Sequence, residues 1–210
     1  MKGVIARGHI FARMHVRKWL TTLIGALISL YAFTATAGPQ IAIQFPGEIS
    51  QIASPNGRHI LVNVDSESKE HTLSLGGNHA LYLRDLKTGE KKKIYAYGRH
   101  VKTLWSPRGN RLMISDYGGS DYANCIIFFF DTARNPIDVQ EQLREKMRGN
   151  KSIFGNHHAY IVGTKWFSEN RVKIKIFGHG DIDPNGFTLW YEYRIGDGFK
   201  KLGYSPRELP

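Results

Sequence analysis

The chain has 210 residues, a formal net charge of +11 at pH 7, 41% apolar residues and one cysteine. A single cysteine cannot form a disulfide within the chain, which excludes a small fold held together by cross-links. Outside the leader described next, about 173 residues remain, and a chain of this length can bury one sizeable core. We therefore expect a single domain, residues 38–210, that is stabilised by packing.

The first 37 residues have the features of a secretory leader with a helical apolar segment. Five basic residues precede an uncharged stretch at residues 19–33, and Ala35-Thr36-Ala37 supplies the small residues of a cleavage site. We predict cleavage after Ala37, which leaves the domain periplasmic or secreted. Retention as a membrane anchor is the alternative, because residues 34–37 extend the uncharged stretch towards the roughly 20 residues of a span. Met1 and Met14 are both candidate starts.

Removal of the leader changes the charge argument. The leader holds five of the 29 Lys and Arg residues and none of the 18 acidic residues, so the net charge falls from +11 to +6. Scattered basic residues at this level are typical of a soluble surface, with an anionic envelope surface as the alternative partner. Nucleic acid is not expected in this compartment, and contact with a membrane is expected only through an uncleaved leader.

Short apolar runs between turn signals predict antiparallel strands along the rest of the chain. In the run at 172–177, apolar side chains alternate with lysines, which predicts one buried and one exposed face. The run at 125–130 is apolar on both faces, which indicates a central strand and a buried Cys125. The predicted strands are residues 60–64, 80–83, 93–97, 111–115, 125–130, 159–162, 172–177 and 188–195.

One segment, residues 136–149, has a helical pattern instead. Val139, Leu143 and Met147 lie four residues apart, and Gly149 is a stop signal. We predict one short amphipathic helix here, packed as a lid on a sheet edge.

A degenerate repeat occurs along the chain. Ser54-Pro55-Asn56-Gly57 precedes one predicted strand, Ser106-Pro107-Arg108-Gly109 precedes another, and a third copy starts near Ser168. Proline fixes φ in such a turn, and Gly or Asn tolerates a positive φ, so each copy predicts a hairpin. Between the first two copies, residues 81–90 read Leu-Tyr-Leu-Arg-Asp-Leu-Lys-Thr-Gly-Glu, a second pair of strands around a Thr-Gly turn.

These motifs resemble the TolB-like, WD-related β-propeller repeats. The resemblance implies blade-like units near residues 41–97, 98–135 and 159–204, although Asn56 and Arg108 stand where the family usually has Asp. Three units are too few for a closed ring, which typically needs four or more blades. We therefore expect an all-β fold of antiparallel blade-like sheets with one helix, either a partial propeller or a β-sandwich.

One local pattern matches the formula of a calcium loop. Residues 181–186 read Asp-Ile-Asp-Pro-Asn-Gly, and Glu192 follows at the required spacing. The flanking segments are predicted strands rather than helices, and Asp-Pro-Asn-Gly is also a good turn sequence. A plain hairpin turn is the main interpretation. A metal site of Asp181, Asp183 and Asn185, with calcium as its ion, is the alternative, and a full site that includes Glu192 is a third.

The sequence contains no G-x-S-x-G, P-loop or dinucleotide fingerprint. Residues 118–121 (Gly-Gly-Ser-Asp) are interpreted as a turn, and no two histidines have the spacing that places both rings on one face. We expect a non-enzymatic binding or structural module that acts on a protein or an envelope component. The alternatives are a metal-assisted hydrolase, with ligands from loops around His157-His158 and residues 181–185, and a structural module that forms a homo-oligomer.

Overall fold

The computed structural model of the chain describes residues 40–65, 79–147, 149 and 151–203. The expected leader and its cleavage site at Ala37 lie outside the described residues. None of the helices in the described part of the chain is long and apolar enough to span a membrane.

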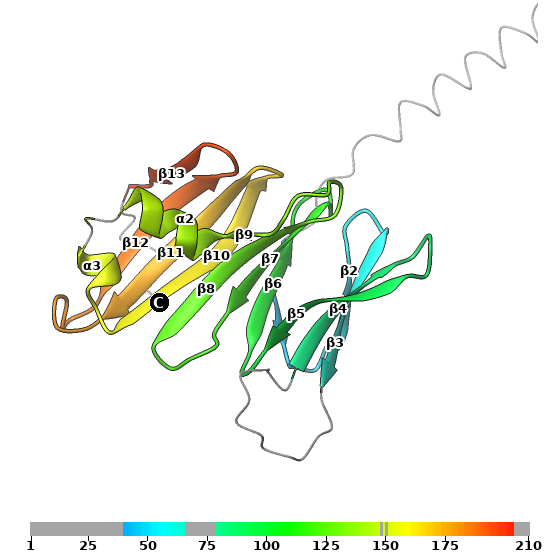
Figure 1. Cartoon of the computed structure of the whole chain (residues 1–210), viewed down its shortest axis with the longest axis horizontal. Coiled ribbons are helices and arrows are strands. Elements are labelled where there is room, and N and C mark those ends of the chain that lie inside the picture. The colour runs from blue at the N-terminus through cyan, green and yellow to red at the C-terminus, as the bar shows by residue number, and fades with distance from the viewer. Residues whose placement is uncertain (1–39, 66–78, 148, 150, 204–210) are drawn as a thin grey trace, which may run out of the picture. The chain divides into compact units, whose positions relative to one another are not determined.

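The described strands fall into three antiparallel groups, which we call the first, second and third sheet units (Figure 1). All eight predicted strands are present, and the expected all-β class is confirmed. The first unit comprises β2 (Gln51–Ala53), β3 (His59–Asp65), β4 (His79–Asp85) and β5 (Lys91–Tyr97). The second comprises β1 (Ile43–Phe45), β6 (Val101–Trp105), β7 (Arg111–Asp116), β8 (Tyr122–Phe129) and β9 (Ile137–Asp138). The third comprises β10 (His158–Ser168), β11 (Arg171–His179), β12 (Phe187–Arg194) and β13 (Gly198–Lys201).

The second and third units are joined at one edge. Tyr122 and Ala123 of β8 pair in parallel with Ala159 and Tyr160 of β10, so the two units form one hydrogen-bonded sheet. The turn signals alone do not predict this pairing.

Beyond these two residue pairs, β10 packs on the face of the second unit. The Gly163 backbone N–H donates to Ser115 Oγ at 3.0 Å, and Trp166 Nε1 donates to the Leu104 carbonyl at 3.1 Å. A Cβ at position 163 would lie 1.9 Å from Sδ of the buried Met113, so a larger residue here would require the Met113 side chain to move. The units therefore share an edge at one end and pack face to face beyond it.

The second unit is buried on both of its faces, as expected for the run at 125–130. Along β8, Cys125 and Ile127 belong to the core shared with the third unit, whereas Phe128 belongs to the core shared with the first. Cys125 has no exposed surface, and burial raises the pKa of its thiol to about 12. The second unit is thus the central layer of the packing.

The predicted helix is present but shorter than expected. Residues 137–138 pair with β8 as strand β9, and α2 (Val139–Lys146) begins after Asp138, whose Oδ1 accepts the Glu141 N–H at 3.0 Å. Val139 and Leu143 are fully buried in the core that contains Ile174 and Ile176, so α2 covers a sheet face. A second helix of four residues, α3 (Lys151–Phe154), was not expected from the sequence.

The two clear repeats form the same turn. The Ser54 carbonyl accepts the Gly57 N–H, and the Ser106 carbonyl accepts the Gly109 N–H, each at 2.9 Å. The two glycines have φ values of +67° and +68°, a conformation that other residues rarely adopt. The hairpins predicted from the repeat are therefore confirmed.

These turns are also bonded to one another. Asn56 Nδ2 in the first turn donates to Asn110 Oδ1 in the second at 3.1 Å. The carboxylate of Glu169, in the turn between β10 and β11, accepts from Ser106 Oγ at 2.8 Å and from the Arg108 N–H. Adjacent sheet units are consequently held at their turns as well as through their cores.

Candidate functional site

The loop between β11 and β12 contains the predicted metal ligands, and it forms a tight turn. The Asp183 carbonyl accepts the Gly186 N–H at 2.9 Å, and Gly186 has a φ of +81°. Asp183 Oδ2 accepts from Asn156 Nδ2 at 2.8 Å, and Asp181 Oδ2 lies 2.9 Å from His157 Nε2. The geometry is that of a hairpin turn fastened to the segment before β10.

The described residues do not assemble a metal cluster at this loop. Among them, no group of three His, Cys, Asp or Glu side chains is placed to hold an ion. Glu192 is bonded to Arg171 and Arg194, so it does not close a calcium loop. A site made of Asp181, Asp183 and Asn185 alone stays a prediction.

A histidine pair that was not predicted from the sequence lies next to this loop. His158 and His179 are opposite each other on β10 and β11, with ring centroids 4.3 Å apart and planes 18° apart. Stacked rings in this arrangement do not point their nitrogens at a common centre. The structure thus brings together the loops considered for a hydrolase, but among the residues it describes these loops place no convergent catalytic set. The pair arises from the register between β10 and β11, and that register cannot be predicted from the spacing of the histidines in the sequence.

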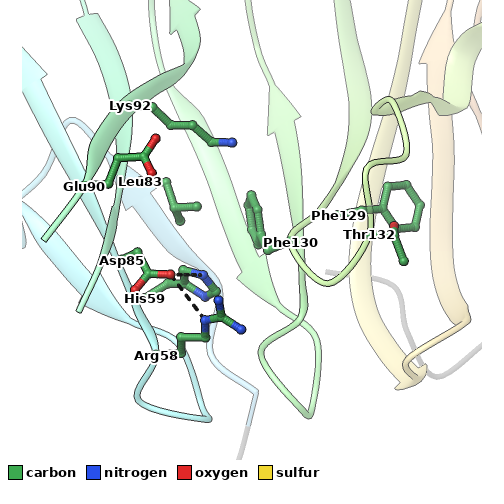
Figure 2. A pocket seen from close by; sticks show the side chains of 9 residues that line it. All are labelled: Arg58, His59, Leu83, Asp85, Glu90, Lys92, Phe129, Phe130 and Thr132. Carbon is green, nitrogen blue, oxygen red and sulfur yellow. Dashed lines mark hydrogen bonds and ion pairs between the residues drawn. The ribbon is translucent and has the colours of Figure 1, made fainter. Parts of the chain in front are cut away.

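A pocket of about 170 Å³ lies between the first and second sheet units (Figure 2). It is lined by residues in or directly before β3, β4 and β5, by the end of β8 and by the segment that follows β8: Arg58, His59, Leu83, Asp85, Glu90, Lys92, Phe129, Phe130 and Thr132.

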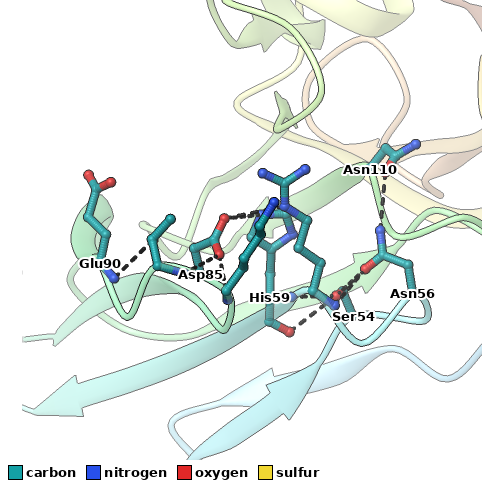
Figure 3. A network of polar contacts seen from close by, with 9 residues as sticks. Ser54, Asn56, His59, Asp85, Glu90 and Asn110 are labelled. Carbon is teal, nitrogen blue, oxygen red and sulfur yellow. Dashed lines mark hydrogen bonds and ion pairs between the residues drawn. The ribbon is translucent and has the colours of Figure 1, made fainter.

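Ser54, His59 and Asp85 near this pocket do not form a catalytic triad (Figure 3). Ser54 Oγ accepts the backbone N–H of His59 at 2.9 Å and donates to Asn56 Oδ1 at 2.7 Å. The serine hydroxyl therefore stabilises the repeat turn, and the imidazole does not activate it.

His59 is the buried polar side chain of the pocket. It is 4% exposed, its Nε2 lies 3.7 Å from Asp85 Oδ2, and its Nδ1 has no hydrogen-bond partner among the described residues. Burial lowers the pKa of His59; the Asp85 carboxylate opposes this shift, and Arg58 and Lys92 add to it. His59 is consequently neutral at pH 7.

The outward side of the third sheet unit carries a second feature, which we call the basic face. On β11, apolar side chains point into the core while the basic side chains alternate outward, as the sequence predicted. Register places basic residues of β10, β12 and β13 on the same side. The basic face comprises Lys165, Arg171, Lys173, Lys175, Arg194 and Lys200.

Two pairs of like charges lie directly opposite each other on this face. Lys165 is the cross-strand partner of Lys173, and Arg171 is the partner of Arg194. The carboxylate of Glu192 is bonded to both arginines. It accepts two hydrogen bonds from Arg171, at 2.9 and 2.7 Å, and one from Arg194 at 2.9 Å. These bonds, those of Arg171 first, lower the pKa of Glu192 to about 2.

Aromatic rings lie between the cations of the basic face. Tyr160 and Phe177 stack across β10 and β11 with centroids 5.0 Å apart. Trp190 lies beside Lys173 and Lys175, whose Nζ atoms are 4.2 and 5.7 Å from its ring. The ring faces fix the lysine stems and present their ammonium groups together.

No family model and no curated protein matches this chain. Among solved structures, the chain is similar to the β-propeller domain of the Trilobed protease from Pyrococcus furiosus, which has an open velcro topology. The two are 18% identical with a TM-score of 0.46, over 74% of this chain and 43% of that chain. This chain thus spans less than half the length of the chain it matches.

Proposed function

We propose that the chain is an exported, non-enzymatic binding module whose basic face holds an acidic polysaccharide of the cell envelope. The observation that carries the proposal is the charge of this face. It presents six cations and one carboxylate, Glu192, which two of those cations already neutralise.

The placement of the cations supports a ligand with repeated negative charges. Like charges directly opposite each other on a sheet destabilise it. Lys165 and Lys173 form such a pair, with Glu192 as the partner of Lys173 on β12, and a ligand anion placed beside Lys165 lowers the repulsion that remains.

The rings on the face favour a sugar chain over a simple salt. Tyr160, Phe177 and Trp190 are each partly exposed. Aromatic side chains in such positions offer an apolar surface to a ligand while they remain in contact with water. A polysaccharide with acid groups offers apolar ring faces to these side chains and anions to the lysines. Export, predicted from the leader, would bring the domain to the compartment where such chains occur.

The same charge argues against self-association through the outward sheet faces. The outward side of the first unit also carries cations, with Arg84 opposite Lys91 and with Lys93 beside them. Two basic faces repel each other, so a homo-oligomer that joins them is a weaker hypothesis.

The test is binding of purified protein to polygalacturonate, measured by titration calorimetry, with neutral dextran of equal length as the reference ligand. We expect saturable binding to polygalacturonate only, weakening several-fold between 50 and 500 mM salt because screening acts on exposed charges.

Variants separate loss of binding from loss of folding. Lys165→Glu should weaken binding at least tenfold while keeping or raising the melting temperature, because the new carboxylate faces Lys173. The matched control is Lys93→Glu on the first unit, which should bind like the wild type. Equal binding of dextran, or equal loss in both variants, would refute the proposal.

A further inference from the structure

The pocket of Figure 2 supports an inference that is independent of the basic face. We propose that it binds a free amino acid with an apolar side chain, as a zwitterion. The charges at its rim, the apolar side chains of Leu83 and Phe130 in its lining and its volume together point to this class of ligand.

Two cations at the rim are suited to a carboxylate. Arg58 uses its Nε to contact Asp85 at 3.3 Å, and its side chain is 56% exposed. The terminal nitrogens of Arg58 and the Nζ of Lys92 have no partner among the described residues, and Figure 2 shows these side chains on opposite sides of the pocket. A guanidinium whose two terminal NH₂ groups are free matches the fork of a carboxylate.

One acidic group at the rim is suited to an ammonium. The Glu90 carboxylate has no hydrogen bond or ion pair within the described part of the chain, although its backbone N–H is bonded to Thr88 Oγ1. Asp85 is occupied: its carboxylate accepts from the Lys87 and Thr88 N–H groups, which lower its pKa, and also contacts Arg58. Glu90 is therefore the available anion.

The balance of charges around the pocket favours a ligand that carries one positive and one negative charge. Arg58 and Lys92 are matched by Asp85 and Glu90, and His59 beneath them is neutral at pH 7. A ligand with only a negative charge would leave Glu90 unpaired near it, whereas a zwitterion pairs with both groups.

Most of the lining is polar, and its apolar part and its volume leave room for one medium apolar side chain. Leu83 and Phe130 line the pocket, and the Phe130 ring is packed against His59 and Trp105 at 5.5 and 5.6 Å. A cavity of about 150 Å³ holds a benzene molecule, so a pocket of about 170 Å³ with an open mouth accommodates the side chain of leucine.

The experiment is titration calorimetry of the full purified chain with L-leucine and two analogues of the same shape. 4-Methylpentanoate lacks the ammonium group, and 3-methylbutylamine lacks the carboxylate. We expect one leucine to bind per chain and each analogue to bind at least tenfold more weakly. Absence of leucine binding, or equal binding of 4-methylpentanoate, would overturn the proposal.

Two arginine variants locate the site. Arg58→Gln should weaken leucine binding at least tenfold. Arg108→Gln, which lies in the second repeat turn at the position that corresponds to Asn56, should leave leucine binding unchanged. Unchanged circular dichroism of both variants shows that the fold is kept. Polygalacturonate binding should be unaffected in Arg58→Gln, so failure of this proposal and failure of the proposed function are distinguishable. Equal leucine affinity in both variants would contradict the assignment of the site.

Discussion

Some side chains in this protein have roles that the surrounding sequence motif does not predict. Glu192 fits the last position of a calcium-loop formula, yet it is bonded to an arginine across the sheet and to another on its own strand. Asn56, at a position where the TolB-like pattern usually has Asp, has an amide that donates to Asn110. An Asp carboxylate could not donate that bond. Both roles are explained by contacts with residues that are distant in the sequence or on a neighbouring strand.

Glu192 gives a prediction for the pH dependence of stability. Its pKa of about 2 lies below its ordinary value of 4.5, so the ionised group stabilises the fold at neutral pH. This contribution is complete above the ordinary value and is lost as the pH falls through 4.5 towards 2. Wild type should therefore lose more unfolding free energy than Glu192→Gln between pH 6 and pH 2.5. Urea midpoints at both pH values measure this difference, and Glu48→Gln, an exposed carboxylate, should behave like wild type. Parallel losses in all three proteins would disprove this role of Glu192.

Strands and turns were predictable from the sequence, whereas their pairing was not. Alternation in residues 172–177 and the Gly57 and Gly109 turns are local signals, so the structure confirms them. Strands β1, β2, β9 and β13 and helix α3 were not predicted and have two to four residues, too few to show a period; the five-residue β6 was not predicted either. The β8–β10 pair, the His158–His179 stack and the pocket at His59 all join segments distant in the chain. The histidine pair and the pocket therefore escaped prediction because tertiary contacts between distant segments create them.

At the scale of the element, Gly178 controls how closely β10 and β11 pair. A Cβ at this position would lie 1.9 Å from the His158 carbonyl oxygen, a backbone atom that cannot move alone. Gly178→Ala should lower the free energy of unfolding by about 1–3 kcal/mol because the strands must separate. Gly98→Ala, where nothing lies within 4 Å of the added Cβ, is the control and should change stability little. Denaturant unfolding of the two variants measures the effect, and equal stability would show that the strand pair adapts.

At the scale of the whole molecule, the described fold is three sheet units with the second between the other two. Each unit contacts its neighbour through a core, through the repeat turns, or through the β8–β10 edge. The outward faces of the first and third units have no further unit of this chain upon them in the described residues. This arrangement leaves the basic face open to a ligand.

The predicted leader has a testable consequence for the N-terminus of the mature chain. If the A-x-A site is used, the exported protein should begin at Gly38, because the peptidase requires small residues at the two positions that Ala35 and Ala37 occupy. Mass spectrometry of the protein from the periplasm or medium measures this terminus. Ala37→Leu should accumulate in the membrane fraction with its leader attached. An intact wild-type chain in that fraction would instead identify the segment as an anchor.

The central position of the second unit also affects the order in which the chain acquires its structure. Met113, Cys125 and Ile127 belong to the core that the strands of the third unit complete, and those strands follow the second unit in the chain. A chain that ends before residue 158 therefore exposes an apolar sheet face and an unpaired β8 edge, which are the features that promote aggregation. If the chain is exported as its predicted leader implies, it has to stay unfolded until it has crossed the membrane. A core that is complete only when the third unit is present would then slow folding before export.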